Sequence, residues 1–381
     1  MATITYLTQI EFEHGALAET EKLARGLGIT APLIVTDKGI AAAGLLDAVK
    51  DALKGFGDLD VFDDTPSNPT EAAALAALDV FRRANCDGLI AVGGGSPIDL
   101  AKAVALLATH DGPLARYAAI EGGVSLIGTV APVIAVPTTA GTGSEVGRAA
   151  LITLEDGRKL GFISPNLIPR IAVCDPDLTL GLPSRLTAAT GLDAISHCVE
   201  TYLSPRINPV AEAIALDGLE RAVGHIRKAV ADGSDRTARW QMMMAALQGG
   251  LTFQKGLGAI HALSHPLGGL KRVSLHHGTL NAILLPFVLD WNEPACAEKY
   301  AAIRARLNVP ADMRLSRFFA DLNADLGLPA TLAEIGVLRS DLEPVAEAAV
   351  KDHSSATNPR PCTAADYLTL LEAALGDGGR I

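Results

Sequence analysis

The sequence predicts an α/β domain built on a parallel sheet, followed by a domain made of helices alone. Up to about residue 180, short β-rich runs alternate with alanine-rich runs, which is typical of a parallel sheet covered by helices on both faces. From Thr187 onward, apolar residues recur at helical spacing and no strong strand signal is found. With 381 residues, the chain is also too long for one ordinary hydrophobic core, so at least two domains are expected.

In the first half, continuous apolar runs predict strands and periodic runs predict helices. The continuous runs predict buried strands at 31–37, 87–94, 131–139 and 170–183. The periodic runs predict helices at 44–55, 71–85 and 97–110. The last of these helices is expected to begin at Pro97, because proline suits the first helical position and removes no N–H that is needed there.

In the second half, every strong signal is helical. Apolar spacing predicts helices at 188–204, 209–232, 236–253, 314–327, 342–352 and 364–375. The change from mixed strand and helix signals to helical signals alone falls between Leu182 and Ser184. We therefore predict a first domain over 1–183 and an all-helical second domain over 184–381.

The composition indicates a well-packed cytoplasmic protein. Hydrophobic residues make up 49% and charged residues 20%, and the net charge of -11 offers no basic stripe for a nucleic acid. The N-terminal stretch has no basic region before an apolar run, so no signal peptide is expected. The most apolar stretch is broken by Pro132 and Pro137, which favours a buried strand over a membrane span. The five cysteines are scattered without C-x-x-C, so neither a disulfide framework nor a zinc ribbon is expected.

A glycine-rich turn is the clearest local motif of the first half. In "LIAVGGGSPIDLAK", a buried strand runs into Gly94, Gly95 and Ser96 before a helix. Glycines let the backbone approach a ligand closely, and a helix N-terminus adds partial positive charge, so the turn resembles a phosphate cradle. Asp99 lies on one side of the following helix. A tight turn without a ligand is the alternative reading of the same residues.

A second loop, "VPTTAGTGSEV", follows the apolar core, 132–136, of the strand predicted at 131–139 and offers the hydroxyls of Thr138, Thr139 and Thr142. Open α/β sheets bind ligands at the carboxyl ends of parallel strands, where both loops are expected. Asp37 ends the first strand and is placed to bind a ribose 2′-OH, while repelling the 2′-phosphate of NADP. NAD is therefore favoured and NADP is the alternative. Asp37 could instead cap a turn or a helix.

Histidines dominate one part of the second half. Asp193 and His197 lie four apart in a helical stretch, and so do His261 and His265, while 276–277 supply a third histidine source. Residues four apart share one helix face. One carboxylate and three imidazoles suit iron or zinc with a position left open for substrate.

A single Asp/His pair is weak evidence, because such a pair more often forms a hydrogen bond on the helix face. The combination of two pairs and a third histidine source favours a metal site. Pro266 disfavours helical geometry at His265, so the helix is expected to kink or end there.

Taken together, these stretches resemble the iron-containing (group III) alcohol dehydrogenase family. The matching motifs are "GGGSPIDLAK", "PTTAGTGSE", "GLDAISHCVE", "HALSHPLGG", "HHGTLNAILLP" and "TNPRP", in family order from about residue 37 to residue 361. The resemblance implies the two-domain fold of that family, to which dehydroquinate synthase is more distantly related. In that fold an α/β dinucleotide-binding domain precedes the helical metal-binding and catalytic domain.

The resemblance also implies roles for individual residues. The family's metal ligands fall on Asp193, His197, His261 and His277, because the last ligand directly precedes a glycine; His276 is the alternative. His265 matches a histidine near the metal that is a candidate for proton relay. The cofactor-binding positions fall on Asp37, Asn68, Gly94, Gly95, Ser96, Asp99, Thr138, Thr139, Thr142 and Lys159.

The function implied is that of a metal-dependent, NAD(P)-linked alcohol dehydrogenase or aldehyde reductase. It would act on a small alcohol, diol or hydroxy acid, with hydride transfer while the substrate oxygen is on Fe²⁺ or Zn²⁺. A homodimer is expected, with the strand at 3–12 a candidate for exchange between subunits. The alternatives are a maleylacetate reductase, which needs no metal, and a metal-dependent hydrolase or lyase, in which the glycine-rich loops would have no task.

Overall fold

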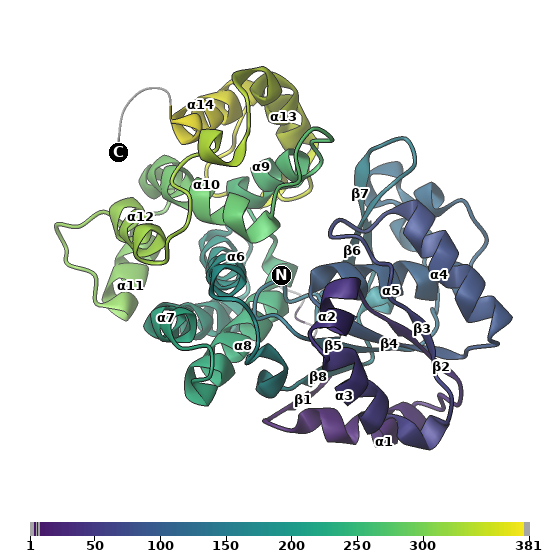
Figure 1. The fold of residues 1–381 in the computed structure, drawn as a ribbon. Helices are drawn as coiled ribbons and strands as arrows, with labels where there is room; N and C mark the ends of the chain where they lie inside the picture. Colours follow the sequence, from purple (N-terminus) through teal and green to yellow (C-terminus); the bar gives the residue numbers. More distant parts are fainter. Residues whose placement is uncertain (1–3, 5, 7, 377–381) are drawn as a thin grey trace. The chain divides into compact units, whose positions relative to one another are not determined.

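The fold is seen in a computed structural model, which describes residue 4, residue 6 and residues 8–376 (Figure 1). The chain divides into two compact units, one from Tyr6 to Gly181 and the other from Leu182 onward. The first unit contains a parallel sheet and the second is helical, so the predicted fold class is confirmed. No helix of the described residues combines the length and apolar character needed to cross a membrane.

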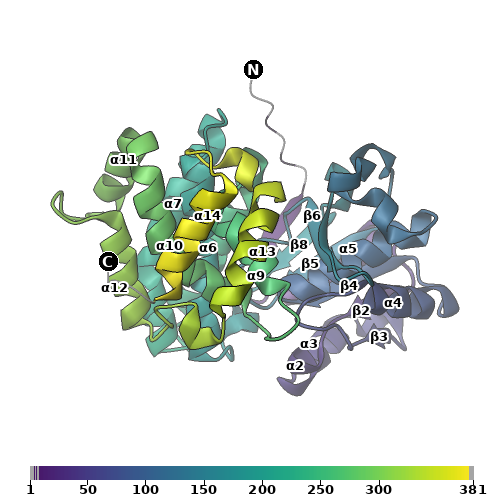
Figure 2. The ribbon, with the colours of Figure 1, turned by 90° about the horizontal axis from the view of Figure 1, so that it is seen from above.

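In the described part of the first unit, six parallel strands form one sheet in the order β1-β8-β5-β4-β2-β3 (Figures 1 and 2). The strands are β1 (Gln9–Phe12), β2 (Pro32–Val35), β3 (Asp60–Phe62), β4 (Gly88–Gly93), β5 (Val133–Pro137) and β8 (Ile171–Cys174). Alternate residues enter opposite cores: Leu89 packs toward α4 (Glu71–Arg83) and α5 (Gly95–Thr109), whereas Ile90 packs toward α1 (Thr20–Gly26) and α3 (Leu45–Ala52). Burial on both faces explains why these strands read as continuous apolar runs.

Three features of the first unit differ from the sequence-based expectation. β3 has only three residues, too few for a periodic signal. An antiparallel hairpin of β6 (Ala149–Thr153) and β7 (Lys159–Ile163) was not expected, although alternate residues of both strands are buried. Of the predicted strand at 3–12, the structure describes β1, while residues 3, 5 and 7 lie outside the described residues.

The start of α5 was also predicted wrongly. The helix begins at Gly95 with Gly94 as its N-cap, two residues before Pro97. Gly93 has a φ of 145°, and a Cβ there would lie 2.7 Å from Cγ of Pro97. A Cβ on Gly95 would lie 2.9 Å from Cγ2 of Thr142. The glycine run therefore lets the chain turn sharply from strand to helix beneath a neighbouring loop.

The described part of the second unit contains nine α-helices. They are α6 (Ser184–Leu203), α7 (Pro209–Ala231), α8 (Arg236–Leu251), α9 (Ala259–Gly268), α10 (His277–Asn292), α11 (Ala297–Leu307), α12 (Leu315–Asp325), α13 (Arg339–Lys351) and α14 (Ala364–Leu375); α2 (Lys38–Ala42) belongs to the first unit. α6 is the central helix, buried from Thr187 to Leu203 and packed against α7, α8 and α10 (Figures 1 and 2). α10 approaches α6 closely, since a Cβ on Gly278 would lie 2.2 Å from the carbonyl oxygen of Ala189.

Of the two outcomes expected at His265, a kink or an end of the helix, the end is ruled out, because α9 continues to Gly268. A proline in the last turn removes only one helical N–H donor. The other end of α9 is held from outside: the Ala259 N–H donates to Oδ1 of Asn358 at 3.1 Å. This contact gives the "TNPRP" motif a structural role, since it satisfies an N–H that the helix leaves free.

A buried lysine ties α5 to the loop and hairpin that follow β5. Lys102 is fully buried, and its Nζ donates to Oγ of Ser144 and to the carbonyl oxygen of Ala149, each at 2.8 Å. Asp99 accepts hydrogen bonds from Oγ of Ser144 at 2.5 Å and from the N–H of Leu151 at 3.0 Å. Burial lowers the pKa of Lys102 to about 8, although Asp99 and Glu145 favour the charged form.

We predict that Lys102→Met lowers the free energy of unfolding by about 3 kcal/mol or more, because the carbonyl oxygens of Gly147 and Ala149 would lose their donor and Asp99 would lose its nearby positive charge. Urea denaturation of the variant and the parent protein measures this difference. Lys22→Met is the control, because Lys22 is exposed and pairs only with Glu19. The control should change stability by less than about 0.5 kcal/mol. Equal stability of both variants would contradict the proposed importance of the Lys102 contacts.

Candidate metal centre and cofactor-binding loops

Three helices of the second unit bring four candidate metal ligands together. Asp193 and His197 lie one turn apart on α6, His261 lies on α9, and His277 is the first residue of α10. Each offers one donor atom, and the four donor atoms lie within 4.8 Å of one another. His276 is not part of this group; it is the N-cap residue of α10, is exposed, and has Nδ1 3.4 Å from Oγ1 of Thr279.

The carboxylate of Asp193 is the centre of the group. Its Oδ1 lies 3.5 Å from Nε2 of His197, 3.7 Å from Nε2 of His261 and 3.6 Å from Nε2 of His277. Asp193 and His261 are buried, whereas the side chain of His277 is 33% exposed, so the group is open on that side. Burial opposes ionisation of Asp193, but the surrounding imidazoles outweigh it and hold its pKa well below the usual range.

Glu200 orients His261 by contacting Nδ1, the ring nitrogen that faces away from the other donors. Glu200 is not among the site residues predicted from the sequence. Oε2 of Glu200 lies 2.6 Å from Nδ1 of His261, and Oε1 accepts the N–H of Ile260 at 2.6 Å. A carboxylate at Nδ1 favours the tautomer that keeps the Nε2 lone pair free toward the other donors. Burial lowers the pKa of His261, but Glu200 and Asp193 outweigh it and raise the pKa to about 9. The available signal was the position of Glu200 three residues after His197.

His265 lies beside the four donors and is linked to a second carboxylate. Its ring stacks on that of His277 with centroids 5.6 Å apart, and its Nδ1 lies 2.8 Å from Oδ2 of Asp352. The ring of His353 also stacks on that of His265, with centroids 5.6 Å apart. Asp352 lies 87 residues from His265, so the sequence carried no signal for this contact. The series of rings extends from the four donors to the exposed side chain of His353.

The donor types decide which metal fits this group. One carboxylate oxygen and three imidazole nitrogens suit Fe²⁺ or Zn²⁺, whereas Mg²⁺ and Ca²⁺ prefer oxygen ligands. The partly exposed side at His277 would leave room for a substrate oxygen. The residues therefore fit the metal that the sequence analysis expected.

In the first unit, the glycine turn and the threonine loop are neighbours. They follow β4 and β5, in which Gly93 pairs with Pro137. A Cβ on Gly94 would lie 3.2 Å from Oγ1 of Thr139, so the turn is tightly packed against the loop. Oγ1 of Thr138 is buried and has no hydrogen-bond partner among the described residues. The backbone amides of the partly buried Gly94 and Gly95 and the hydroxyl of Thr138 suit the phosphate and ribose groups of a dinucleotide.

The remaining predicted cofactor residues have identified protein partners. Oγ of Ser96 donates to the carbonyl oxygen of Ser67 at 2.6 Å, and Nζ of Lys159 donates to Oδ1 of Asn68 at 3.0 Å. Asp37 caps α2 by accepting the N–H of Ile40 at 3.0 Å, which is the alternative role considered for it. Asp99, as described above, holds the threonine loop and the hairpin.

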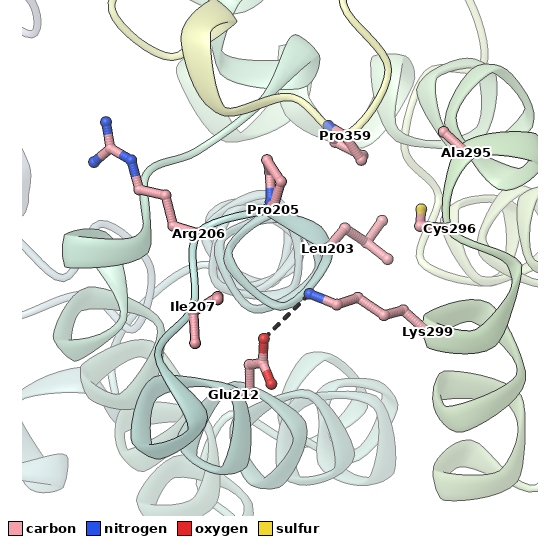
Figure 3. Close-up of a pocket in the computed structure, with 9 residues that line it drawn as sticks. All are labelled: Leu203, Pro205, Arg206, Ile207, Glu212, Ala295, Cys296, Lys299 and Pro359. Atoms are coloured by element: carbon pink, nitrogen blue, oxygen red, sulfur yellow. Dashed lines mark hydrogen bonds and ion pairs between the residues drawn. The ribbon is translucent and has the colours of Figure 1, made fainter. Parts of the chain in front are cut away.

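A separate pocket of about 410 Å³ lies in the second unit and contains none of the four donors (Figure 3). Lys299 and Glu212 form an ion pair in its lining, with Nζ of Lys299 3.2 Å from Oε1 of Glu212. Lys299 also donates to the carbonyl oxygens of Tyr202 and Ser204. Lys299 and Glu212 are thus engaged with each other and with the backbone, and the pocket contains none of the candidate metal ligands.

Comparisons with known proteins agree with this geometry. Residues 8–176 match the family model described as iron-containing alcohol dehydrogenase, and residues 187–375 match the C-terminal model of the Fe-containing alcohol dehydrogenase family. A 4-hydroxybutyrate dehydrogenase of Cupriavidus necator is 53% identical over 98% of this chain and 100% of its own. A 1,3-propanediol dehydrogenase of Citrobacter freundii is 39% identical over 92% of each chain.

Solved structures show the same likeness. A crystal structure of 1,3-propanediol oxidoreductase superimposes with a TM-score of 0.91 at 35% identity, covering 98% of this chain and 100% of the other. An alcohol dehydrogenase from Oenococcus oeni gives a TM-score of 0.92 at 32% identity, with the same coverage. The resemblance noted in the motifs is thus confirmed over both units. The chain belongs to the iron-containing alcohol dehydrogenase family and is an oxidoreductase that acts on CH–OH groups.

Proposed function

We propose that this enzyme interconverts a short ω-hydroxy acid of the 4-hydroxybutyrate class and the corresponding aldehyde acid, with NAD as hydride carrier and Fe²⁺ as metal. The identity of 53% to the 4-hydroxybutyrate dehydrogenase, over essentially both full chains, carries the choice of substrate class. In this proposal the domain at 1–183 binds the dinucleotide, and the domain at 184–381 holds the metal and the substrate. No observation favours a hydrolase or lyase, and the complete donor set argues against a metal-independent maleylacetate reductase.

The proposed ligands are Asp193, His197, His261 and His277, with Zn²⁺ as the alternative to Fe²⁺. A divalent ion bound there would supply Lewis acidity toward the substrate oxygen. Glu200 keeps Nε2 of His261 available, and the depressed pKa of Asp193 keeps its carboxylate ionised. His265, beside His277 and bonded to Asp352, is placed to take up the hydroxyl proton and release it toward solvent.

The proposed cofactor residues are Asp37, Asn68, Gly94, Gly95, Ser96, Asp99, Thr138, Thr139, Thr142 and Lys159. The nicotinamide would exchange the hydride, and the protein would position it. The buried hydroxyl of Thr138 and the amides of the glycine turn support phosphate binding. Ser96, Asn68 and Lys159 form one bonded group with Ser67 beside the turn, and Asp99 supports the threonine loop.

We further propose a cytoplasmic homodimer. The net charge of -11 and the scattered cysteines support the location, and family resemblance supports the dimer. The first strand of the sheet, β1, is an edge strand, so a second copy of the chain could extend the sheet there.

His261→Ala should abolish both metal retention and turnover, because it removes an imidazole from the buried donor group and leaves Glu200 without its partner. Metal content after gel filtration and NAD-dependent oxidation of 4-hydroxybutyrate measure the two effects. His225→Ala is the control, since His225 lies on α7, away from the candidate ligands in sequence, with Nδ1 2.9 Å from the carbonyl oxygen of Arg221. A metal-free His261→Ala variant with full activity would end the metal assignment.

Asp37→Asn should raise the use of NADP relative to NAD by about tenfold or more, because removal of the carboxylate charge removes its repulsion of the 2′-phosphate. Asparagine keeps an oxygen that can cap α2, so the fold should be retained. Steady-state kinetics with both cofactors measure the ratio. Asp51→Asn, on the exposed side of α3, should leave it unchanged. An unaltered ratio in Asp37→Asn would place the ribose elsewhere.

A kinetic screen tests the substrate class. We expect kcat/KM for 4-hydroxybutyrate to exceed that for 1,3-propanediol and for 1-butanol by about tenfold or more, because a site built to bind a carboxylate loses that interaction with the other two. All three substrates carry a primary hydroxyl, so hydride transfer is the same. A higher kcat/KM for the diol would refute the proposed hydroxy acid while leaving the dehydrogenase activity in place.

A further inference from the structure

One buried polar residue of the second unit has no role in the function proposed above. Asn281 is fully buried in α10, one turn after His277. It stands in the apolar run "LNAILLP", where leucine would pack without any need for a hydrogen bond. A polar side chain in such a place indicates that specific partners hold it there. The residue four after His277 shares its helix face, which was the available sequence signal.

The amide nitrogen of Asn281 points at the candidate ligands. Nδ2 donates to Oδ1 of Asp193 at 2.7 Å and lies 3.2 Å from Nε2 of both His261 and His277. Nδ2 carries two hydrogens and no lone pair: one hydrogen goes to Asp193, and the other is available to an imidazole Nε2 that has no hydrogen of its own. For His261 this agrees with Glu200, which takes the Nδ1 hydrogen. The amide nitrogen of Asn281 thus lies within hydrogen-bond distance of three of the four donor atoms.

The other end of the same amide supports this orientation. Oδ1 of Asn281 is buried and has no hydrogen-bond partner among the described residues. If the amide were turned over, Oδ1 would face the carboxylate of Asp193, which would repel it. Leaving Oδ1 without a partner is unfavourable as well. The contacts of Nδ2 therefore outweigh that cost and determine how the side chain lies.

We propose that Asn281 is a positioning residue that keeps the donor atoms of Asp193, His261 and His277 converged independently of the metal. The proposal rests on the metal site of the proposed function. Lone pairs directed at one point repel one another unless a cation, a proton or an N–H donor lies among them. The amide of Asn281 supplies such a donor, so the ligands remain in place while the protein is metal-free. Once a cation binds the imidazole nitrogens, only the contact with Asp193 is still needed.

The consequence is a difference between two forms of the same protein. Removal of the amide should destabilise the metal-free protein, in which no metal ion holds the donor atoms together and Asp193 would lose its hydrogen bond from Asn281. It should affect the metal-loaded protein much less, because the cation then holds the same donor atoms. The quantity to measure is the gap between the melting temperature of the metal-loaded protein and that of the chelator-treated protein.

We expect Asn281→Leu to widen this gap by about 3 °C or more relative to the parent protein, as the loss of buried hydrogen bonds from the metal-free form alone would do. Asn281→Asp keeps the shape and places a second carboxylate beside Asp193, so it should widen the gap further. This second variant decides the question if the leucine variant does not fold. Differential scanning calorimetry, with Fe²⁺ added anaerobically and Zn²⁺ as a second probe, gives the four melting temperatures needed for each comparison.

Asn323→Leu is the matched control. Asn323 lies on α12, is buried, donates through Nδ2 to the carbonyl oxygen of Ala282, and has an Oδ1 without a partner among the described residues. Its replacement should lower both melting temperatures equally. If Asn281→Leu and Asn281→Asp also lower both equally, Asn281 serves packing only and the inference is overturned while the metal site stands. If neither ion raises the melting temperature of the parent protein, the metal site and the inference fail together.

Discussion

The second unit depends on one electrostatic constraint, which is the burial of the Asp193 carboxylate. A buried charge is tolerated only where groups of opposite sign or hydrogen-bond donors surround it. Three imidazoles from α6, α9 and α10 and the amide of Asn281 meet this requirement. The close approach of α10 to α6 at Gly278 is what brings two of these groups within reach. The candidate metal centre therefore forms only when α6, α9 and α10 pack against one another.

A second layer of carboxylates holds the imidazoles. Glu200 binds His261 and the first turn of α9, and Asp352 binds His265. Each carboxylate selects which ring nitrogen carries the hydrogen, so the chemistry of the ring is decided by a residue that need not touch a substrate. In the helical unit, Asp193 lies among the donor imidazoles, Glu200 fixes the tautomer of the donor His261, and Asp352 fixes that of the neighbouring His265.

The first unit follows the same physical rule with the opposite charge. Lys102 is buried, and its ammonium group binds a hydroxyl and carbonyl oxygens of the segment that follows β5. Asp99 completes this network, and the glycine turn lies against the threonine loop without side chains of its own. The network holds the threonine loop against α5, which leaves the amides of the turn and the hydroxyl of Thr138 for a ligand.

Local sequence patterns were enough to predict the main secondary structure and several candidate site residues. Apolar periodicity predicted the parallel sheet and the helical domain, because helices and strands impose their own spacing on a sequence. The pair Asp193 and His197 could be read as sharing one helix face for the same reason, and the glycine and threonine loops could be placed at strand ends. The motifs together predicted the family. Short strands and exact helix ends were not predicted from the sequence. β3 is too short for a periodic signal, α5 begins at Gly95, and α9 continues past Pro266.

The sequence by itself therefore determined the fold class, the family and the residue types of the candidate site, because all of these follow from local spacing and motif order. Only the tertiary structure decided which groups meet. It brought His277 and not His276 into the donor group, and it joined Glu200 to His261 and Asp352 to His265. It also turned the amide of Asn281 toward three donor atoms. These choices depend on contacts between helices far apart in the chain, and such contacts leave no periodic trace in the sequence.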